Sequence, residues 1–239
     1  ELPDCSTPRL RGRSLVEFGS GRKRRGYSLA SAVLHSARHL STLMLATDPS
    51  LKPMHFCSDC GQPVALVVPA DDNRLRHVCA ECGTIHYQNP KLVVGTIPWW
   101  QSERQVLLCR RAIEPRRGYW TLPAGFMENN ETTEEAAQRE TMEEAGARVE
   151  LLGLFALLNV PHVHQVHLFY RARLLHLDFS AGPESLECRL FSESEIPWQE
   201  LAFPTVSHTL QRFFADLDRL TEGAQVALHT LDIRKRLHE

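Results

Sequence analysis

The stretch from Gly125 to Ala147 constrains this chain more than any other part of its 239 residues. Within it, Glu140, Glu143 and Glu144 are spaced so that a helix, turning about 100° per residue, brings their carboxylates to one face. Unpaired like charges at this spacing destabilise a helix by roughly 0.2–0.5 kcal/mol per pair. A hard divalent cation with oxygen ligands would offset that repulsion, so the sequence predicts a cation site on this helix.

The ends of this helix are also marked in the sequence. Thr132 followed by Glu135 is a capping box, which predicts that the helix begins near Thr133. Gly146 supplies a residue that can end it in a left-handed conformation. The apolar side expected to pack on a sheet consists of Ala136, Ala137, Met142 and Ala145.

Two further residues of the stretch are expected to support the site. Arg139 carries a planar guanidinium that can hold one carboxylate, Glu131 or Glu143, in a fixed rotamer. Gly125 is expected in a loop before the helix, where a bare backbone lets a carbonyl approach a metal or phosphate.

The stretch resembles the Nudix box, Gly-x5-Glu-x7-Arg-Glu-U-x-Glu-Glu-x-Gly-U, in which U is a bulky aliphatic residue. Every fixed position matches in register: Gly125, Glu131, Arg139, Glu140, Glu143, Glu144 and Gly146. The chain departs from the pattern at the two U positions, where Thr141 and Ala147 are small. The resemblance implies an α/β/α sandwich with a mixed sheet, and hydrolysis of a diphosphate bond. It also implies Mg²⁺ or Mn²⁺ held by Glu140 and Glu144, with Glu143 close by.

Residues outside the box complete the expected site. In the family, a box carboxylate or a downstream loop glutamate takes the proton from the attacking water. Glu184 and Glu187 are the loop candidates, of which we assign Glu187, although a solvated turn without a role is the alternative. Arg110 and Arg111 end a strand-like run and could clamp phosphate oxygens, or be ordinary surface charge.

Two Cys-x2-Cys motifs lie upstream, with 18 residues between Cys60 and Cys79. Four thiolates at this spacing, Cys57, Cys60, Cys79 and Cys82, fit one tetrahedral structural zinc; a redox pair or disulfides are the alternatives. The segment is too short for an apolar core, so the metal should stabilise most of its fold. His77 and His86 are expected on the surface, because four thiolates already close the site. Of the other cysteines, Cys5, Cys109 and Cys188, none has a pattern typical of a nucleophile.

These features predict four segments. Residues 1–53 form a basic extension, with eight basic and three acidic residues before Thr47, and are a transit peptide or precede a true start at Met44 or Met54. Residues 54–88 form the zinc ribbon, 89–222 the Nudix domain and 223–239 a tail without a clear role. The expected location is the cytoplasm, or a plastid or mitochondrion if the extension is a transit peptide.

The formal charge of −2 does not favour a nucleic-acid surface, and no apolar run approaches the ~20 residues of a membrane span.

The elements around the box follow from periodicity. Residues 91–98 and 105–110 are expected to form a hairpin, with further strands at 119–123, 149–158 and 164–175. A second helix over 207–217 should cover the sheet with Leu210, Phe213, Phe214 and Leu217.

The substrate is suggested by finer resemblance within the family. The segments 87–91, 120–125 and 182–191 look like those of the zinc-ribbon group that includes plant FAD pyrophosphatase, and Pro161 is similar to a mark of ADP-ribose pyrophosphatases. This implies FAD or ADP-ribose as substrate and a homodimer. The alternatives are an NADH pyrophosphatase, whose motif residues 196–204 do not match, and a non-catalytic nucleotide sensor. Tyr87, Trp120 and Phe126 could stack on a base or simply pack, and a metal role for His162, His164 and His167 is disfavoured by their alternation.

Overall fold

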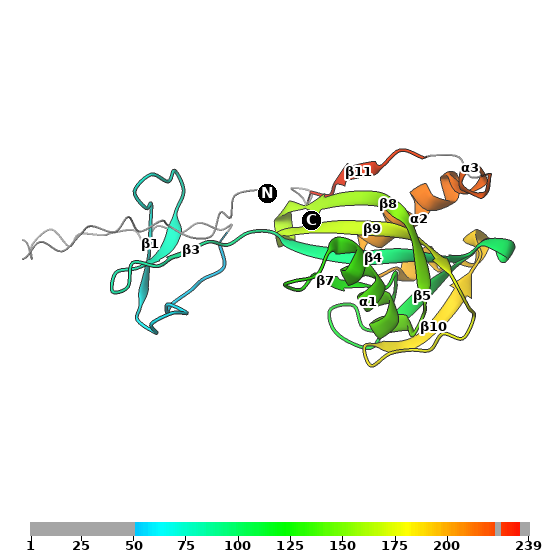
Figure 1. Ribbon diagram of the computed structural model, residues 1–239, viewed down its shortest axis with the longest axis horizontal. Coiled ribbons are helices and arrows are strands. Elements are labelled where there is room, and N and C mark those ends of the chain that lie inside the picture. Colours follow the sequence, from blue (N-terminus) through cyan, green and yellow to red (C-terminus); the bar gives the residue numbers. More distant parts are fainter. Residues whose placement is uncertain (1–50, 223–225, 235–239) are drawn as a thin grey trace, which may run out of the picture. The chain divides into compact units, whose positions relative to one another are not determined.

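The computed structural model describes residues 51–222 and 226–234 (Figure 1). They fall into two compact units, one ending at Thr84 and one beginning at Ile85. The basic extension up to residue 50, with Cys5 and Met44, lies outside the described residues, as do residues 223–225 and 235–239.

The first unit is organised by two tight turns that carry the cysteines. Gly61 and Gly83 follow the second cysteine of each motif with φ of 75° and 76°, a left-handed conformation that glycine adopts without strain. Each glycine N–H returns to the first cysteine of its motif, at 2.9 Å for the Cys57 carbonyl and 3.0 Å for the Cys79 carbonyl. Its strands β1 (Val64–Val67) and β2 (Arg76–Cys79) belong to a small sheet of order β1-β2-β3, whose last strand β3 (Ile85–His86) begins directly after the division at Thr84.

A mixed sheet of eight strands forms the frame of the second unit. The strands are β4 (Lys91–Trp100), β5 (Gln105–Arg111), β6 (Trp120–Thr121), β7 (Ala124–Phe126), β8 (Val149–Val160), β9 (Gln165–Leu174), β10 (Ser185–Phe191) and β11 (His229–Asp232). The main order is β10-β5-β4-β9-β8-β11, while β6 pairs with β5 and β7 with β4. The β4–β9 and β8–β11 pairs are parallel and the others antiparallel. The hairpin expected from residues 91–98 and 105–110 is present as β4 and β5.

The helices cover opposite faces of this sheet, as Figure 1 shows for α1 (Thr133–Ala145) and α2 (Pro204–Ala215). Successive side chains of a strand alternate between faces. Tyr170 of β9 accordingly packs in the cluster that holds Ala136 and Ala137 of α1, whereas its neighbour Phe169 packs with α2. The expected α/β/α sandwich with a mixed sheet is confirmed.

The larger apolar core lies between α2 and the sheet. Leu210, Phe213, Phe214 and Leu217 are 0%, 1%, 7% and 3% exposed, so the predicted covering residues are buried. The helix expected over 207–217 instead spans 204–215, and Leu217 begins the next helix. The Phe213 ring packs edge-on against Trp99 at 5.5 Å and against Phe155 at 5.9 Å between centroids. Short helical turns complete the unit: α3 (Leu217–Thr221), η1 (Gln101–Glu103), η2 (Pro161–Val163), η3 (Glu193–Glu195) and η4 (Trp198–Glu200).

The C-terminal segment has a structural role that the sequence did not indicate. Residues 229–232, part of the tail expected to be without a role, form β11 and pair in parallel with residues 156–159 of β8. Four residues without marked alternation carry too little pattern to identify a strand in isolation. No helix among the described residues is long and apolar enough to cross a membrane.

Candidate active site

The helix α1 begins and ends where its capping residues place it. The Thr132 hydroxyl accepts the Glu135 N–H at 3.2 Å, and the Glu135 carboxylate accepts the Thr132 N–H at 2.7 Å, a complete capping box. At the other end Gly146 has φ 58°, and its N–H donates to the Met142 carbonyl at 2.9 Å. Both predicted limits are therefore present in the structure.

The face of α1 that meets the sheet differs from the expected one at one position. Met142 is 43% exposed, so the prediction that it packs on the sheet is wrong. Thr141 is fully buried instead, and its hydroxyl lies 2.6 Å from that of Thr96 on β4. The cause is angular: Ala137, Thr141 and Glu144 are three or four residues apart, whereas Met142 is turned about 100° from Thr141. The Thr141 hydroxyl is satisfied by bonding back to the Ala137 carbonyl at 2.7 Å.

The guanidinium of Arg139 connects the acidic residues of the box. It binds Glu131 through two parallel hydrogen bonds of 2.9 Å and 2.8 Å, the strongest geometry for this pair. This contact holds the pKa of the Glu131 carboxyl down at about 2. The same guanidinium donates to Glu140 at 2.7 Å, to Glu143 at 3.0 Å and to the Phe126 carbonyl at 3.1 Å. Arg139 therefore fixes the positions of three carboxylates.

Gly125 lies beneath the acidic face, in β7 rather than in the expected loop. It pairs with Val94 of β4, so the expectation of a loop is wrong; three residues containing a glycine are too short to indicate a strand. A Cβ at Gly125 would overlap the Glu140 carboxylate. The neighbouring N–H of Ala124 donates to the Glu144 carboxylate at 3.1 Å. Glycine at this position therefore leaves the space that the Glu140 side chain occupies.

Two of the box glutamates are buried although they are acidic. Glu140 is 9% exposed and Glu144 is 7% exposed. Burial raises the pKa of Glu144 to about 7, an effect that the Ala124 N–H opposes in part. Burial also raises the pKa of Glu140, although Arg139 opposes that shift. Burying a carboxylate costs free energy, and proteins keep such groups mainly where they are needed. Carboxylates with raised pKa values are therefore common in functional sites.

The residues outside the box take different positions around these acids. Arg111 on β5 lowers the pKa of Glu144 through its charge, and its guanidinium also lies over the Phe203 ring at 5.2 Å. Arg110 faces away from this pair: it donates to the Gly118 carbonyl at 2.9 Å and lies 3.8 Å from the Glu187 carboxylate.

Of the two downstream glutamates, only Glu184 lies close enough to act on the buried acids. Glu187 lies on β10, where it is exposed and faces Arg110, so its expected position in a loop is wrong. Glu184 lies just before β10, and its charge raises the pKa of both Glu140 and Glu144. The sequence alone could not tell which of these two glutamates lies near the acids of α1. That depends on where β10 begins, which is at Ser185, directly after Glu184.

The acids suit a hard cation in their chemistry, although they are not gathered as a ready ligand set. In the described part of the chain, no three carboxylates bring their oxygens within 4.8 Å of one another. Arg139 instead contacts both Glu140 and Glu143. The carboxylate oxygens of Glu140 and Glu144, buried and of like charge, nonetheless match the ligands that Mg²⁺ and Mn²⁺ prefer.

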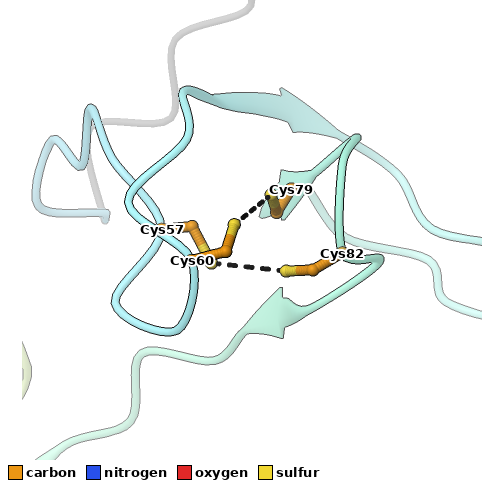
Figure 2. Close-up of side chains that lie close together, drawn as sticks. All are labelled: Cys57, Cys60, Cys79 and Cys82. Carbon is orange, nitrogen blue, oxygen red and sulfur yellow. Dashed lines mark hydrogen bonds between the residues drawn. The ribbon is translucent and has the colours of Figure 1, made fainter.

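The four cysteines of the first unit are gathered as a metal site (Figure 2). Their sulfurs all lie within 4.8 Å of one another, at 3.6 Å for Cys57–Cys82 and 3.5 Å for Cys60–Cys79. Four sulfurs each ~2.3 Å from a zinc ion at the corners of a tetrahedron would be ~3.8 Å apart, so the geometry fits. His77 is buried at 6% exposure, so the expectation that it lies on the surface is wrong; it is on β2, whose side chains alternate toward the interior.

The aromatic residues that were candidates for base stacking separate into two groups. Trp120 is 5% exposed and packs edge-on against Phe191 at 4.8 Å, so it belongs to the core. Tyr87 and Phe126 are 60% and 48% exposed, and the Lys91 ammonium lies 4.8 Å from the Phe126 ring centre.

Comparison with known proteins agrees with this geometry. The model of the family described as "NUDIX domain" matches residues 89–213, and the one described as "Nudix N-terminal", a zinc ribbon, matches residues 55–88. A crystal structure of a NUDIX hydrolase from Nitrosomonas europaea is 53% identical, with a TM-score of 0.70 over 76% of this chain and all of that one.

Curated relatives are more distant. The NAD-capped RNA hydrolase NudC of Vibrio parahaemolyticus is 34% identical over 43% of this chain, which spans only 36% of that protein. The ADP-ribose pyrophosphatase of Methanocaldococcus jannaschii is 29% identical over 49% of this chain and 69% of its own length. Because the NUDIX model matches more than half of the sequence, from just before β4 into α2, the chain belongs to the Nudix family.

Proposed function

We propose that this chain hydrolyses the diphosphate bond of an ADP-linked substrate, ADP-ribose or FAD, to give two monophosphates in the presence of Mg²⁺ or Mn²⁺. The observation that supports it most is the pair of buried carboxylates, Glu140 and Glu144, beside Gly125 in a box whose fixed positions all match. A cation bound there would neutralise diphosphate charge and lower the pKa of a water. Zinc in the four-cysteine site would be structural, since its shell is closed. Residues 54–88 and 89–222 are the two domains in this proposal.

The chain's own residues position the reacting groups. Arg139 keeps Glu131, Glu140 and Glu143 in place, and the Ala124 N–H holds one oxygen of Glu144. Arg111, whose charge acts on Glu144, would contact the phosphates, and Arg110 would do so only after releasing Glu187. Preorganised charges of this kind stabilise the charge that develops in the transition state.

The general base is assigned to Glu184 rather than to Glu187. Glu184 is exposed, and its charge acts on both buried glutamates, whereas Glu187 faces Arg110. An exposed carboxylate near the acids can accept a proton from the attacking water and release it to solvent. In this assignment Glu184→Gln lowers turnover more than Glu187→Gln does.

The relatives support the substrate class. One is named an ADP-ribose pyrophosphatase and another a NAD-capped RNA hydrolase. Both names denote a substrate in which adenosine diphosphate is joined to a second group, and FAD has the same arrangement. One binding site for the ADP half would therefore suit ADP-ribose, an NAD cap and FAD. The name of the second relative favours an NAD-type substrate as the runner-up. A nucleotide sensor without turnover is a weaker alternative, because all the box carboxylates are present.

A substrate panel tests the proposal. The purified chain is incubated with Mg²⁺ and ADP-ribose, FAD, NADH or NAD-capped RNA, and the release of AMP, or of RNA with a 5′-monophosphate from the capped RNA, is followed. ADP-ribose or FAD should be cleaved, and Glu144→Gln should abolish cleavage while the circular dichroism spectrum stays unchanged. Cleavage of NADH alone would replace the substrate assignment with the runner-up. A panel without any product, from protein that binds Mn²⁺, would indicate the sensor.

A further inference from the structure

Two cysteines outside the four-cysteine site lie side by side on neighbouring strands of the large sheet. Cys109 of β5 and Cys188 of β10 are direct partners in the antiparallel register, and their sulfurs are 3.3 Å apart. Cys109 is 1% exposed, whereas Cys188 is partly exposed and so open to small solutes. Direct partners in an antiparallel pair have Cα atoms ~4.5–5.5 Å apart, within the range that a disulfide spans.

The two thiols also lie against the end of α1. The Cys188 and Cys109 sulfurs are 3.5 Å and 3.9 Å from the Glu144 carbonyl oxygen. The Gly182 N–H donates to the same oxygen at 3.0 Å. The last turn of the box helix is therefore in contact with both sulfurs, through the backbone of a residue whose side chain belongs to the proposed active site.

We propose that Cys109 and Cys188 form a site of reversible oxidation, in which a hydroperoxide converts the two thiols into a disulfide. Cys188, the accessible thiol, attacks the peroxide; its sulfur gains an oxygen as sulfenic acid, and the O–O bond breaks to release water or an alcohol. The Cys109 sulfur then attacks the Cys188 sulfur, forming the S–S bond and releasing water. The two cysteines lose two electrons in total, and the peroxide gains them.

Oxidation would change the support of α1. The sulfurs must approach from 3.3 Å to a bond of ~2.05 Å, and because the strand spacing already suits the bond, both side chains rotate and their sulfurs shift relative to the Glu144 carbonyl. Both S–H groups are lost, so the Glu144 carbonyl keeps the Gly182 N–H and loses its sulfur donors. Displacements of ~1 Å in a positioning element can lower turnover up to ~100-fold, and we expect a loss of roughly ten-fold here.

The oxidation site is tested by mass mapping of the full chain. The protein is treated with hydrogen peroxide, unfolded in the presence of N-ethylmaleimide, and digested. A peptide pair joining Cys109 to Cys188, absent after dithiothreitol, is expected. Recovery of both cysteines as maleimide adducts, under peroxide that oxidises other thiols of the chain, would overturn the proposal. This readout does not require hydrolase activity, so it stands apart from the test of the proposed function.

The effect on α1 is tested with a matched variant. Cys188→Ser cannot form the bond but keeps a polar side chain of similar size. Peroxide should lower turnover of the parent chain, with recovery in dithiothreitol, and should leave the variant's turnover unchanged. Metal content is measured in parallel, because the four ribbon thiols can also be oxidised. A mapped Cys109–Cys188 disulfide with unchanged turnover would show that the pair does not act on the helix.

Discussion

Arg139 makes all five of its side-chain hydrogen bonds to acidic residues or to a carbonyl of the proposed site. Lysine has the same charge but no planar fork, so it cannot make the paired bonds to Glu131 and still reach Glu140 and Glu143. We expect Arg139→Lys to lower kcat by about 10- to 100-fold with little change in Tm. Arg173→Lys, at the exposed pair with Glu150, is the matched control and should leave kcat unchanged. Equal effects of the two variants would exclude a positioning role for Arg139.

His167 is a second residue whose environment has a measurable consequence. It lies between Val93 and Leu158 on the neighbouring strands, and burial lowers its pKa to about 4. From ~6.5, the value in an unfolded chain, down to about 4, the unfolded state binds a proton that the folded state does not. Stability from this residue is therefore fully present above pH ~6.5. As the pH falls from ~6.5 toward 4, the free energy of unfolding decreases by roughly 2–3 kcal/mol, because the unfolded state gains a proton on His167 and the folded state does not.

The variant His167→Leu tests this pH dependence. Its unfolding free energy, measured by urea denaturation at several pH values, should fall less steeply than that of the parent chain between pH ~6.5 and ~4. His162→Leu changes an exposed histidine of η2 and serves as the control. Parallel pH curves for the parent and His167→Leu would contradict the assigned environment.

At the scale of elements, the two main helices could be predicted from the sequence, because the residues that indicate each helix lie within the helix or at its ends. The capping box at Thr132 and the left-handed Gly146 act within one turn, and the apolar spacing of α2 reflects a single buried face. The strands β7 and β11 could not be predicted, since pairing with a distant strand rather than their own pattern makes them strands. The position of Glu184 near the acids depends in the same way on where β10 begins.

The covering role of α2 can be tested at Phe213, one of its buried aromatic residues. Phe213→Ala removes a ring that contacts Trp99, Phe155 and Phe214, and leaves a cavity in the larger core. The unfolding free energy should fall by about 3–5 kcal/mol. Arg212→Ala, one residue earlier and exposed, should change it by less than about 0.5 kcal/mol. A loss below about 1 kcal/mol for Phe213→Ala would mean that the helix is not needed to close this core.

At the scale of the whole molecule, the two units depend on different sources of stability. The second unit has its own apolar clusters, whereas the first has short strands and four convergent thiols. The spacing of the cysteines predicted this convergence, because two short turns and a hairpin leave few other arrangements. Burial of His77 was missed, since the sequence does not reveal which face of so small a sheet is enclosed.

A metal held by the four cysteines would stabilise the first unit alone, so its removal should unfold that unit and spare the other. Cys79→Ser removes one of the four proposed ligands, a buried one, so residues 51–84 should lose protection from hydrogen exchange and the zinc content should fall below that of the parent chain. Exchange within β4, β8 and β9 should stay as slow as in the parent chain. Ser58→Ala, beside a ligand but not itself one, is the control. Rapid exchange throughout the chain would show that the second unit depends on the first.

The parallel strand β11 occupies the outer border of β8 along residues 156–159. Cutting the chain before Val226 would uncover that border, and an unpaired strand border recruits strands from other molecules. Shortened versions made for crystallisation would thus gain a tendency to polymerise, and an affinity tag placed after β11 is a better choice than trimming the tail.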